Sequence, residues 1–274
     1  MWKWIREHGI VATTIGVVLA GALTFTLAPL QEVFAQRAVD RDQERSDAAR
    51  APISVEGVRR DEEVLRSLSF PGIVPPEYVH KSAQPGFLPP EVVETGMVQD
   101  FEEGTGDPPR VFDQFFFTLV GQHSETVKIR DIDVRVTYRQ EPLSGSLGYW
   151  TPQGAMAQEP LGFDLDSANT RARQMVPDSS PPEETGRMYF DERQVTLEKN
   201  EKIEFKAAIM TRSCRCEFVL DVSTDDGRTV EVNNDGKPFK ISGFAHVYDA
   251  PYAHDISVDR VVPCRWPDEC LTRY

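Results

Sequence analysis

The chain has 274 residues, of which 40% are hydrophobic and 27% charged, and its formal net charge at pH 7 is −14. This length and composition are typical of a globular protein with a buried core and argue against a disordered chain. The negative charge repels phosphate backbones, which argues against nucleic acid as a partner, and its simplest role is solubility.

The N-terminal residues predict a membrane anchor. Residues 9–31 contain no charged side chain, and this run is long enough for a transmembrane helix, which needs about 20 apolar residues. Trp2, Lys3 and Trp4 precede the run, where they suit the lipid–water interface. A cleaved signal peptide is the alternative, but its apolar region usually spans only about 7–15 residues. We therefore expect a retained single-pass helix with the lipid bilayer as its partner.

The orientation of this helix follows from two opposing signals. Arginines after the span outnumber the basic residues before it, which by the positive-inside rule would keep the large domain in the cytoplasm. A very short N-terminal tail usually stays inside, however, and four cysteines suit an oxidising compartment. We expect residues 1–8 to be cytoplasmic and the C-terminal domain to be extracytoplasmic; a cytoplasmic domain with reduced cysteines is the alternative.

Two connecting segments follow the predicted anchor. Residues 32–70 carry interleaved arginines and acids at helical spacing, which predicts a helical or flexible stalk. Residues 71–110 are rich in proline, which prevents helix and central strand. This second segment is either a semi-extended linker or a strap along the domain, and its apolar side chains favour the strap.

Residues 111–274 have the pattern of an exported β domain. "VFDQFFFTLVG" places Phe115, Phe117 and Leu119 on one face, and "IDVRVTY" alternates in the same way. Val127 and Ile129 are in the opposite phase to this second strand, which predicts a bulge near residues 130–131.

Further strands are predicted at Val195–Leu197, around residues 203–209, and in "CEFVLDVST", "RTVEVN" and "FKISGFAHVY". "TDDG" and "NNDG" are turns, because Asn, Asp and Gly tolerate positive φ. About eight short strands with turns between them predict a mostly β fold, an antiparallel immunoglobulin-like β-sandwich preceded by one transmembrane helix.

A long insertion interrupts the strands at residues 141–187, where only "LGFDLD" has a strand-like pattern. Long loops on a rigid sheet scaffold often carry binding surfaces. This segment is therefore a candidate surface for a protein or an envelope polymer; the alternative is a tolerated insertion without a partner.

The segments "YFDERQVTLEKNEKIEFKAAI", "CRCEFVLDV" and "NNDGKPFKISG", with the turn Asp235-Gly236-Lys237-Pro238-Phe239, resemble a group of uncharacterised actinobacterial proteins. These proteins combine one N-terminal span with an exported β-rich domain. The resemblance covers residues 110–250. It implies the placement and the fold, and it implies no catalytic residue.

The four cysteines are disulfide candidates: Cys214, Cys216, Cys264 and Cys270. Their spacing fits neither a structural zinc site nor a thioredoxin-like centre, and an even number outside the cytoplasm favours two disulfides. Residues i and i+2 of a regular strand lie about 6.5 Å apart at Cα, too far for a bond. We therefore favour bonds from Cys214 and Cys216 to the two C-terminal cysteines, although a strand broken at Arg215 would allow the local pairs.

No common catalytic motif is present, and no cofactor is expected. Asp131, Asp133, Asp164 and Asp166 are weak candidates for a calcium site, since calcium prefers several oxygen ligands. In an acidic protein the simpler interpretation is a solvated strand face. The sequence therefore favours a membrane-anchored extracytoplasmic binding or scaffolding module without a catalytic role. An anchored hydrolase of envelope polymers is the alternative.

Overall fold

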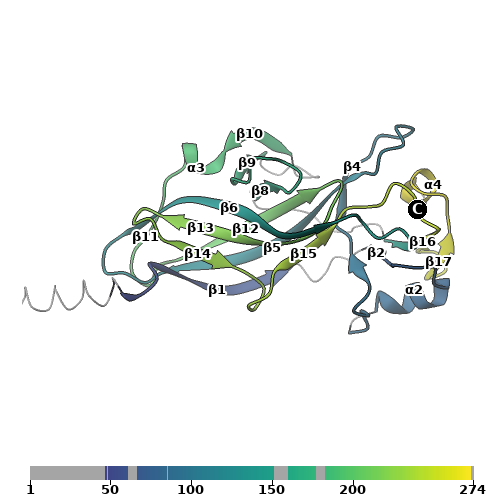
Figure 1. Cartoon of the computed structure of the whole chain (residues 1–274), viewed down its shortest axis with the longest axis horizontal. Helices are drawn as coiled ribbons and strands as arrows, with labels where there is room; N and C mark the ends of the chain where they lie inside the picture. Colours follow the sequence, from purple (N-terminus) through teal and green to yellow (C-terminus); the bar gives the residue numbers. More distant parts are fainter. Residues whose placement is uncertain are drawn as a thin grey trace, which may run out of the picture. The chain divides into compact units, whose positions relative to one another are not determined.

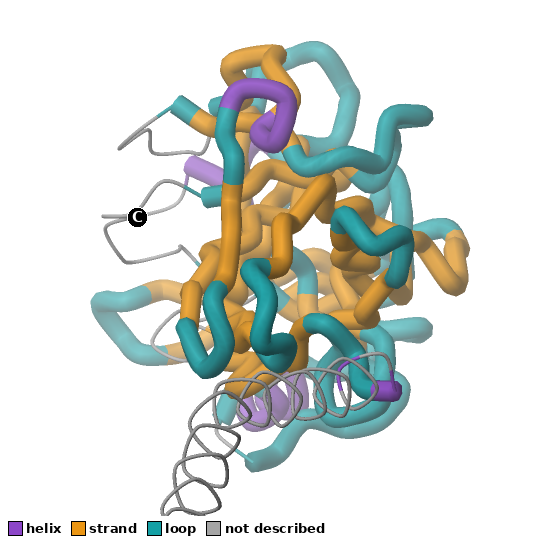
Figure 2. The backbone as a smooth tube through the Cα atoms, turned by 90° about the vertical axis from the view of Figure 1, so that its left-hand side faces the viewer, coloured by secondary structure: helices purple, strands orange, loops and turns teal. Residues whose placement is uncertain are grey.

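The computed structural model describes residue 47 and residues 49–60, 67–84, 86–150, 160–176 and 183–272. Met1–Ala51 and Pro52–Tyr274 form two compact units, and the named strands and helices all lie in the second. This second unit is mostly β, as predicted, and its short helices lie at the periphery of the strands (Figure 2).

The largest sheet has seven strands in the described residues, in the order β1-β5-β12-β8-β9-β10 with β4 beside β5. Its strands are β1 (Ile53–Arg60), β4 (Met97–Asp100), β5 (Arg110–Gly121), β8 (Leu161–Asp164), β9 (Arg173–Met175), β10 (Glu184–Met188) and β12 (Lys202–Thr211). β5 and β12 form a long antiparallel pair at its centre, and β8 lies parallel to β12. The short helix α3 (Tyr189–Glu192) follows β10.

The second sheet has five strands in the described residues, in the order β11-β6-β13-β14, with β15 also paired to β13. Its strands are β6 (Val127–Gln140), β11 (Val195–Leu197), β13 (Arg215–Thr224), β14 (Thr229–Val232) and β15 (Phe239–Ser242). All of its pairs are antiparallel. β12 and β13 follow each other in the chain but belong to different sheets, so the turn between them joins the two layers.

A third sheet of five short strands lies at one end of this unit, together with two helices (Figure 1). Its strands are β2 (Leu68–Ser69), β3 (Val93–Glu94), β7 (Ser146–Tyr149), β16 (Ala250–Asp255) and β17 (Arg260–Pro263), and the helices are α2 (Pro76–Ser82) and α4 (Asp268–Thr272). β7, which belongs to the insertion, pairs with β2 on one side and lies parallel to β16 on the other, so this sheet joins the insertion to chain segments before and after it.

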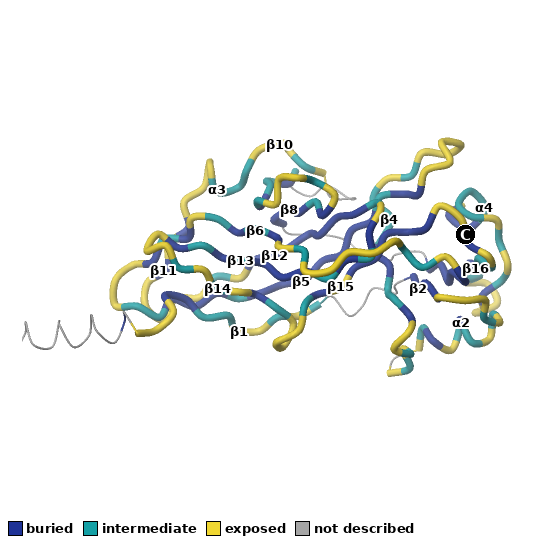
Figure 3. Tube along the Cα trace, viewed as in Figure 1, coloured by how far each residue is buried: buried dark blue, intermediate teal, exposed yellow. Residues whose placement is uncertain are grey.

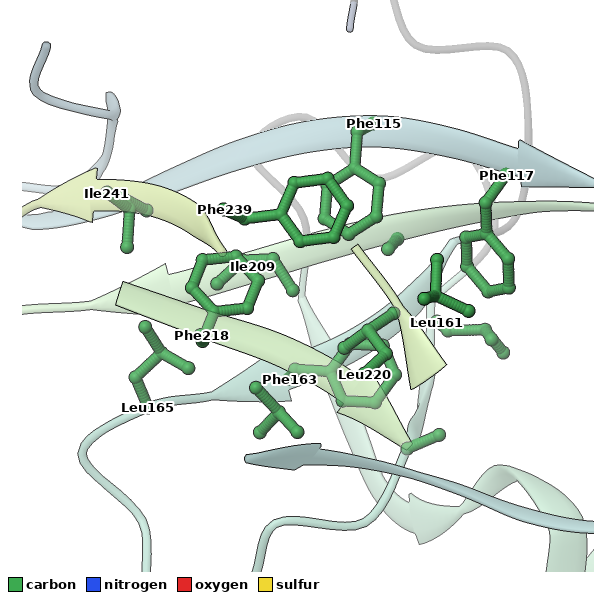
Figure 4. Packing of buried hydrophobic residues seen from close by; sticks show 14 of the residues in the cluster. Phe115, Phe117, Leu161, Phe163, Leu165, Ile209, Phe218, Leu220, Phe239 and Ile241 are labelled. Carbon is green, nitrogen blue, oxygen red and sulfur yellow. The ribbon is translucent and has the colours of Figure 1, made fainter. Parts of the chain in front are cut away.

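Phenylalanine rings join the two larger sheets (Figure 4). Phe115 of β5 stacks on Phe239 of β15 with ring centroids 4.2 Å apart, and Phe239 stacks on Phe218 of β13 at 5.4 Å. These three rings are nearly inaccessible to solvent. The strands of both sheets carry the buried residues, whereas the loops are mostly exposed (Figure 3). The two sheets therefore face each other across one hydrophobic core.

The structure confirms the strand pattern predicted for residues 111–140. Phe115, Phe117 and Leu119 share the main core. On β6 the register skips Arg130, because Ser223 pairs with Asp131 and the next residue of β13 pairs with Ile129. This bulge turns the apolar side chains on both sides of it into the same core, as the change of phase in the sequence indicated.

Residues 53–60 form β1 where the sequence predicted a stalk. This strand pairs antiparallel with β5 and has a register shift between Glu56 and Val58. The residue between them, Gly57, has φ 64°, in the left-handed region that glycine adopts without strain. Because the bulge shifts the apolar phase, Val55 and Val58 do not show the regular period of two by which a strand is recognised.

The proline-rich segment packs against the third sheet over much of its length. Val79 and Val92 of this segment are buried together with Leu68, Phe70 and Trp150 in a second hydrophobic cluster. The segment therefore lies along the domain as a strap and is not a free linker. Burial of these side chains removes apolar surface from water, which holds the segment in place.

Candidate functional site

A pocket of about 390 Å³ lies near the start of β5. Four segments form its wall: the chain before β5, the chain after β6, the turn between β12 and β13, and the loop between β15 and β16. Its lining residues are Pro108, Glu141, Pro142, Ser144, Ser213, Phe244, Ala245, His246, Val247 and Asp249. Because these segments are far apart in the sequence, the pocket exists only in the folded domain.

The loop at residues 243–249 has an exposed tip and a buried base. Val247 is 72% exposed, whereas Phe244 and Tyr248 are buried. The indole of Trp266 packs against both rings, with centroid distances of 4.7 Å to Phe244 and 5.4 Å to Tyr248. The indole N–H also donates a hydrogen bond to the carbonyl oxygen of Ala245 at 3.0 Å. These contacts fix the loop in advance, which lowers the entropic cost of binding a ligand.

The loop begins where the predicted strand "FKISGFAHVY" ends early. β15 stops at Ser242 because the next residue, Gly243, leaves the sheet and approaches the β12–β13 turn. A Cβ atom on Gly243 would lie 2.5 Å from the carbonyl oxygen of Arg212. Its N–H donates to the carbonyl oxygen of Cys214 at 2.9 Å. Only glycine permits this approach, so the residue sets where the pocket wall starts.

The hydroxyl of Tyr248 holds the base of the loop. It accepts a hydrogen bond from the N–H of Ala245 at 3.0 Å and shares another with the hydroxyl of Ser69 on β2 at 3.1 Å. Burial raises the pKa of Tyr248 to about 12, although both hydrogen bonds act in the opposite direction. The neutral phenol is therefore the form that the folded domain requires.

This burial predicts a stability loss at alkaline pH. An unfolded tyrosine titrates near pH 10, so the contribution of Tyr248 is complete below about pH 10 and falls by roughly 3 kcal/mol as pH rises to about 12. We expect Tyr248→Phe to unfold about 1–2 kcal/mol more easily at pH 7, because it leaves the N–H of Ala245 without its acceptor. Above pH 10 this difference should shrink. Urea unfolding of both proteins at pH 7 and pH 11 measures it, and an unchanged difference would refute the role given to the phenol.

The carboxylate of Asp166 holds the β12–β13 turn beside the pocket. It accepts hydrogen bonds from the N–H of Arg212 at 2.6 Å and from the hydroxyls of Thr211 and Ser213, both at 3.1 Å. Arg139 adds an ion pair at 3.4 Å. The oxygens of Asp166 are thus engaged in supporting the turn, which places Ser213 in the pocket wall.

All four cysteines form disulfides, Cys214–Cys216 and Cys264–Cys270. The favoured pairing between the two groups was therefore wrong. That prediction assumed a regular strand through residues 214–216, but β13 begins at Arg215 and Cys214 belongs to the preceding turn. The Cα atoms of Cys214 and Cys216 are consequently only 5.5 Å apart, within the range that a disulfide spans.

Both disulfides lie in segments that form or support the pocket wall. Cys214 follows the lining residue Ser213, and the bond between Cys264 and Cys270 closes the segment that carries Trp266. Each bond limits the freedom of a segment that supports the pocket wall. A C-terminal bond that closes so short a loop is worth about 2 kcal/mol in a chain-entropy account.

The structure does not gather the four calcium candidates, Asp131, Asp133, Asp164 and Asp166, into one site. Asp131 pairs with Arg171, and Asp164 lies 3.1 Å from Arg110. Burial and the nearby charge of Asp131 raise the pKa of Asp133. Among the described residues, no group of three or more His, Cys, Asp or Glu side chains is arranged to hold a metal ion.

The predicted insertion is largely built into the sheets. Its strand-like piece forms β8, as expected, but the same segment also contributes β7, β9 and β10. Its residues Glu141, Pro142 and Ser144 line the pocket. The parts of the insertion at 151–159 and 177–182 lie outside the described residues. The insertion thus supplies one wall of the pocket as well as strands of two sheets.

The predicted membrane segment lies outside the described residues, as do its interface residues Trp2, Lys3 and Trp4. In the part of the chain that the structure describes, no helix combines the length and hydropathy needed to cross a bilayer.

Glu141 and Asp249 line the pocket, and their carboxylates have no partner among the described residues. Both residues are exposed, and neither side chain makes a hydrogen bond or ion pair within the described ranges of the chain. Sequence reasoning missed them, together with His246. No local pattern marks them, since residues 141 and 249 belong to loops that are far apart in the sequence and meet beside the pairing of β7 with β16.

Comparisons with known proteins add little. No family model matches the chain, and no curated protein matches it. Among solved structures, the X-ray structure of Northeast Structural Genomics Consortium target SoR45 is similar over 72% of this chain and 92% of that chain, at 10% identity and a TM-score of 0.27. A likeness of this size carries no argument about fold or function.

Proposed function

We propose that this chain is a membrane-anchored extracytoplasmic protein whose β-rich domain is a non-catalytic binding or scaffolding module at the cell surface. The observation that carries the proposal is the pocket, with its pre-fixed 243–249 loop and with Glu141 and Asp249, whose carboxylates have no partner in the part of the chain that the structure describes. A rigid concave site with a few polar groups is the usual form of a binding site. Its partner would be a protein or an envelope polymer.

The environment of the carboxylates in and near the insertion supports a binding role over hydrolysis. Asp164 pairs with Arg110, and Glu184 pairs with Arg173 at 2.6 Å. The carboxylate of Asp166 accepts hydrogen bonds from the β12–β13 turn. These carboxylates are held by arginines or by the backbone, whereas a hydrolase of polymers needs two carboxyl groups that are free to act on the bond it cleaves. The hydrolase alternative would need a proton donor in the pocket itself.

The extracytoplasmic placement rests on the predicted span and is supported by the cysteines. Paired cysteines persist in oxidising compartments, and all four are paired in this chain. The chain enters the domain at Pro52, whose carbonyl accepts a hydrogen bond from Gln122 just after β5. The pocket lies near the other end of β5, roughly 40 Å away by strand geometry. A domain anchored through Pro52 would thus carry its pocket at the opposite end.

The finer fold assignment is also a proposal. Two sheets that face each other across one core, with mainly antiparallel pairs, support an immunoglobulin-like sandwich. We extend the same proposal to the resemblance with uncharacterised actinobacterial single-span proteins, which combine this arrangement with an N-terminal anchor.

Binding of the full-length chain to native cell-envelope fractions tests the function. We expect the detergent-solubilised protein to be retained, and Ser144→Trp, which fills the pocket from an exposed lining position, to lose at least tenfold in retention. The matched control is Ser124→Trp, in the distant β5–β6 turn, which should bind like the original protein. Equal retention of the two variants would show that the pocket is not the surface that binds the envelope.

Reporter fusions after Tyr274 test the placement in the same cells. An active phosphatase fusion is expected, since that enzyme needs an oxidising compartment. An active β-galactosidase fusion would instead place the domain in the cytoplasm and overturn the extracytoplasmic assignment.

A further inference from the structure

The charges around the pocket are unbalanced. Its lining includes two carboxylates, Glu141 and Asp249, but no lysine or arginine. Elsewhere near this end of the domain, carboxylates meet cations: Asp166 pairs with Arg139, and Asp100 pairs with Arg212 at 3.1 Å. The two carboxylates of the pocket are therefore an exception among their neighbours.

An unpaired pair of like charges favours a ligand of opposite charge. Both carboxylates attract cations, and the net charge of −14 for the whole chain strengthens this attraction. His246 at the rim is the one lining side chain that could carry a positive charge. The pocket therefore disfavours anionic ligands such as phosphates or acidic sugars.

The remaining lining residues favour a cation with an aliphatic part. Pro108, Pro142 and Val247 supply apolar surface, and the hydroxyl of Ser144 can accept a hydrogen bond from an ammonium group. The volume of about 390 Å³ is far larger than a bare ion needs. The described residues also contain no three-ligand group for a metal ion. An inorganic cation thus fits this pocket poorly.

We propose that the pocket binds an organic cation, an alkylammonium group whose aliphatic stem lies against Pro108, Pro142 and Val247 while its charge lies between Glu141 and Asp249. The end of a lysine side chain and a small free alkylamine present the same chemistry. This ligand class rests on the proposed function, because it assigns the chemistry that the binding module recognises.

Calorimetric titration of the full-length protein in non-ionic detergent tests the ligand class with 1-aminopentane as the probe. We expect 1-aminopentane to bind at least tenfold more tightly than 1-pentanol, which has the same stem without the charge. Glu141→Gln and Asp249→Asn should each weaken binding of the amine about three- to tenfold, with a larger loss in the double variant. Raising the salt concentration should weaken binding further, because the carboxylates are exposed.

Glu125→Gln is the matched control, since Glu125 is also exposed and lies in the β5–β6 turn, away from the pocket. If Glu125→Gln weakens amine binding as much as Glu141→Gln does, the amine responds only to overall charge and the assignment is wrong. Equal binding of 1-pentanol would also refute it. Thermal unfolding should be the same for all these variants, because each replaces an exposed side chain by its amide.

Peptides distinguish the two sources of the ammonium group. A short peptide with one central lysine that binds more tightly than 1-aminopentane identifies a protein side chain as the ligand, and weaker binding identifies a free amine. If Ser144→Trp abolishes envelope retention but no amine binds, the result supports the binding function and refutes the proposed ligand class. If amines bind while Ser144→Trp leaves envelope retention unchanged, the result supports the proposed ligand class and refutes the proposed function of the pocket.

Discussion

Phe115→Ala is expected to lower the free energy of unfolding by about 3–5 kcal/mol, the usual range for truncating a buried phenylalanine. Phe115 belongs to β5, but its ring touches rings of the opposite sheet, with centroids 4.2 Å from Phe239 and 6.4 Å from Phe218. Removing the ring opens a cavity between the layers, and the stacked rings lose their partner. Equilibrium unfolding in guanidinium chloride measures the change.

Ile256→Ala is the control for this result. Ile256 is a large apolar residue that is 58% exposed in the turn between β16 and β17. Its truncation removes little buried surface and should change stability by less than about 0.5 kcal/mol. A loss of under 1 kcal/mol for Phe115→Ala would contradict the arrangement in which the two sheets share one core.

Arg173→Met is expected to destabilise the domain by about 2–4 kcal/mol, although it replaces a charged residue by an apolar one of similar length. Arg173 lies 2.6 Å from Glu184, and the side chains are only 16% and 15% exposed. It also donates to the hydroxyl of Ser167 at 2.7 Å. Without Arg173, the one cation left beside Glu184 among the described residues is Arg110, at 3.5 Å, so the mostly buried charge of Glu184 is poorly compensated.

The comparison with Arg187→Met isolates the effect of burial. Arg187 makes a similar ion pair with Glu192 at 2.9 Å, but the two side chains are 67% and 45% exposed. Solvent screens this pair, so its loss should cost less than about 0.5 kcal/mol. The double variant Arg173→Met/Glu184→Leu should recover part of the stability that Arg173→Met loses. Equal effects of Arg173→Met and Arg187→Met would mean that the half-buried pair contributes no more than a surface pair.

Much of the fold could be predicted from the sequence, because alternation of apolar residues reflects strand geometry directly. Phe115, Phe117 and Leu119 alternate because successive side chains of β5 point to opposite faces, and the same rule located β11 at Val195–Leu197. The change of phase before Ile132 even located the bulge of β6. These features depend on neighbouring residues, which the sequence places side by side.

The features that sequence reasoning missed depend on contacts between distant segments or on one glycine. β1 was not predicted because the bulge at Gly57 shifts the alternation of its apolar residues. The end of β15 was not predicted because it depends on the packing of Gly243 against Arg212. The pairing of Cys214 with Cys216 depended on the residue at which β13 begins. The pocket joins residues more than 100 positions apart, so no spacing along the chain could indicate it.

The support beneath the 243–249 loop separates what keeps the domain folded from what a ligand would touch. Phe244 and Tyr248 are held by Trp266, whereas His246 and Val247 between them contact solvent. Changes at these two tip positions therefore leave the buried base intact. Such a loop can acquire a new specificity by substitutions at its tip alone, in the way that a fixed framework accepts different recognition residues.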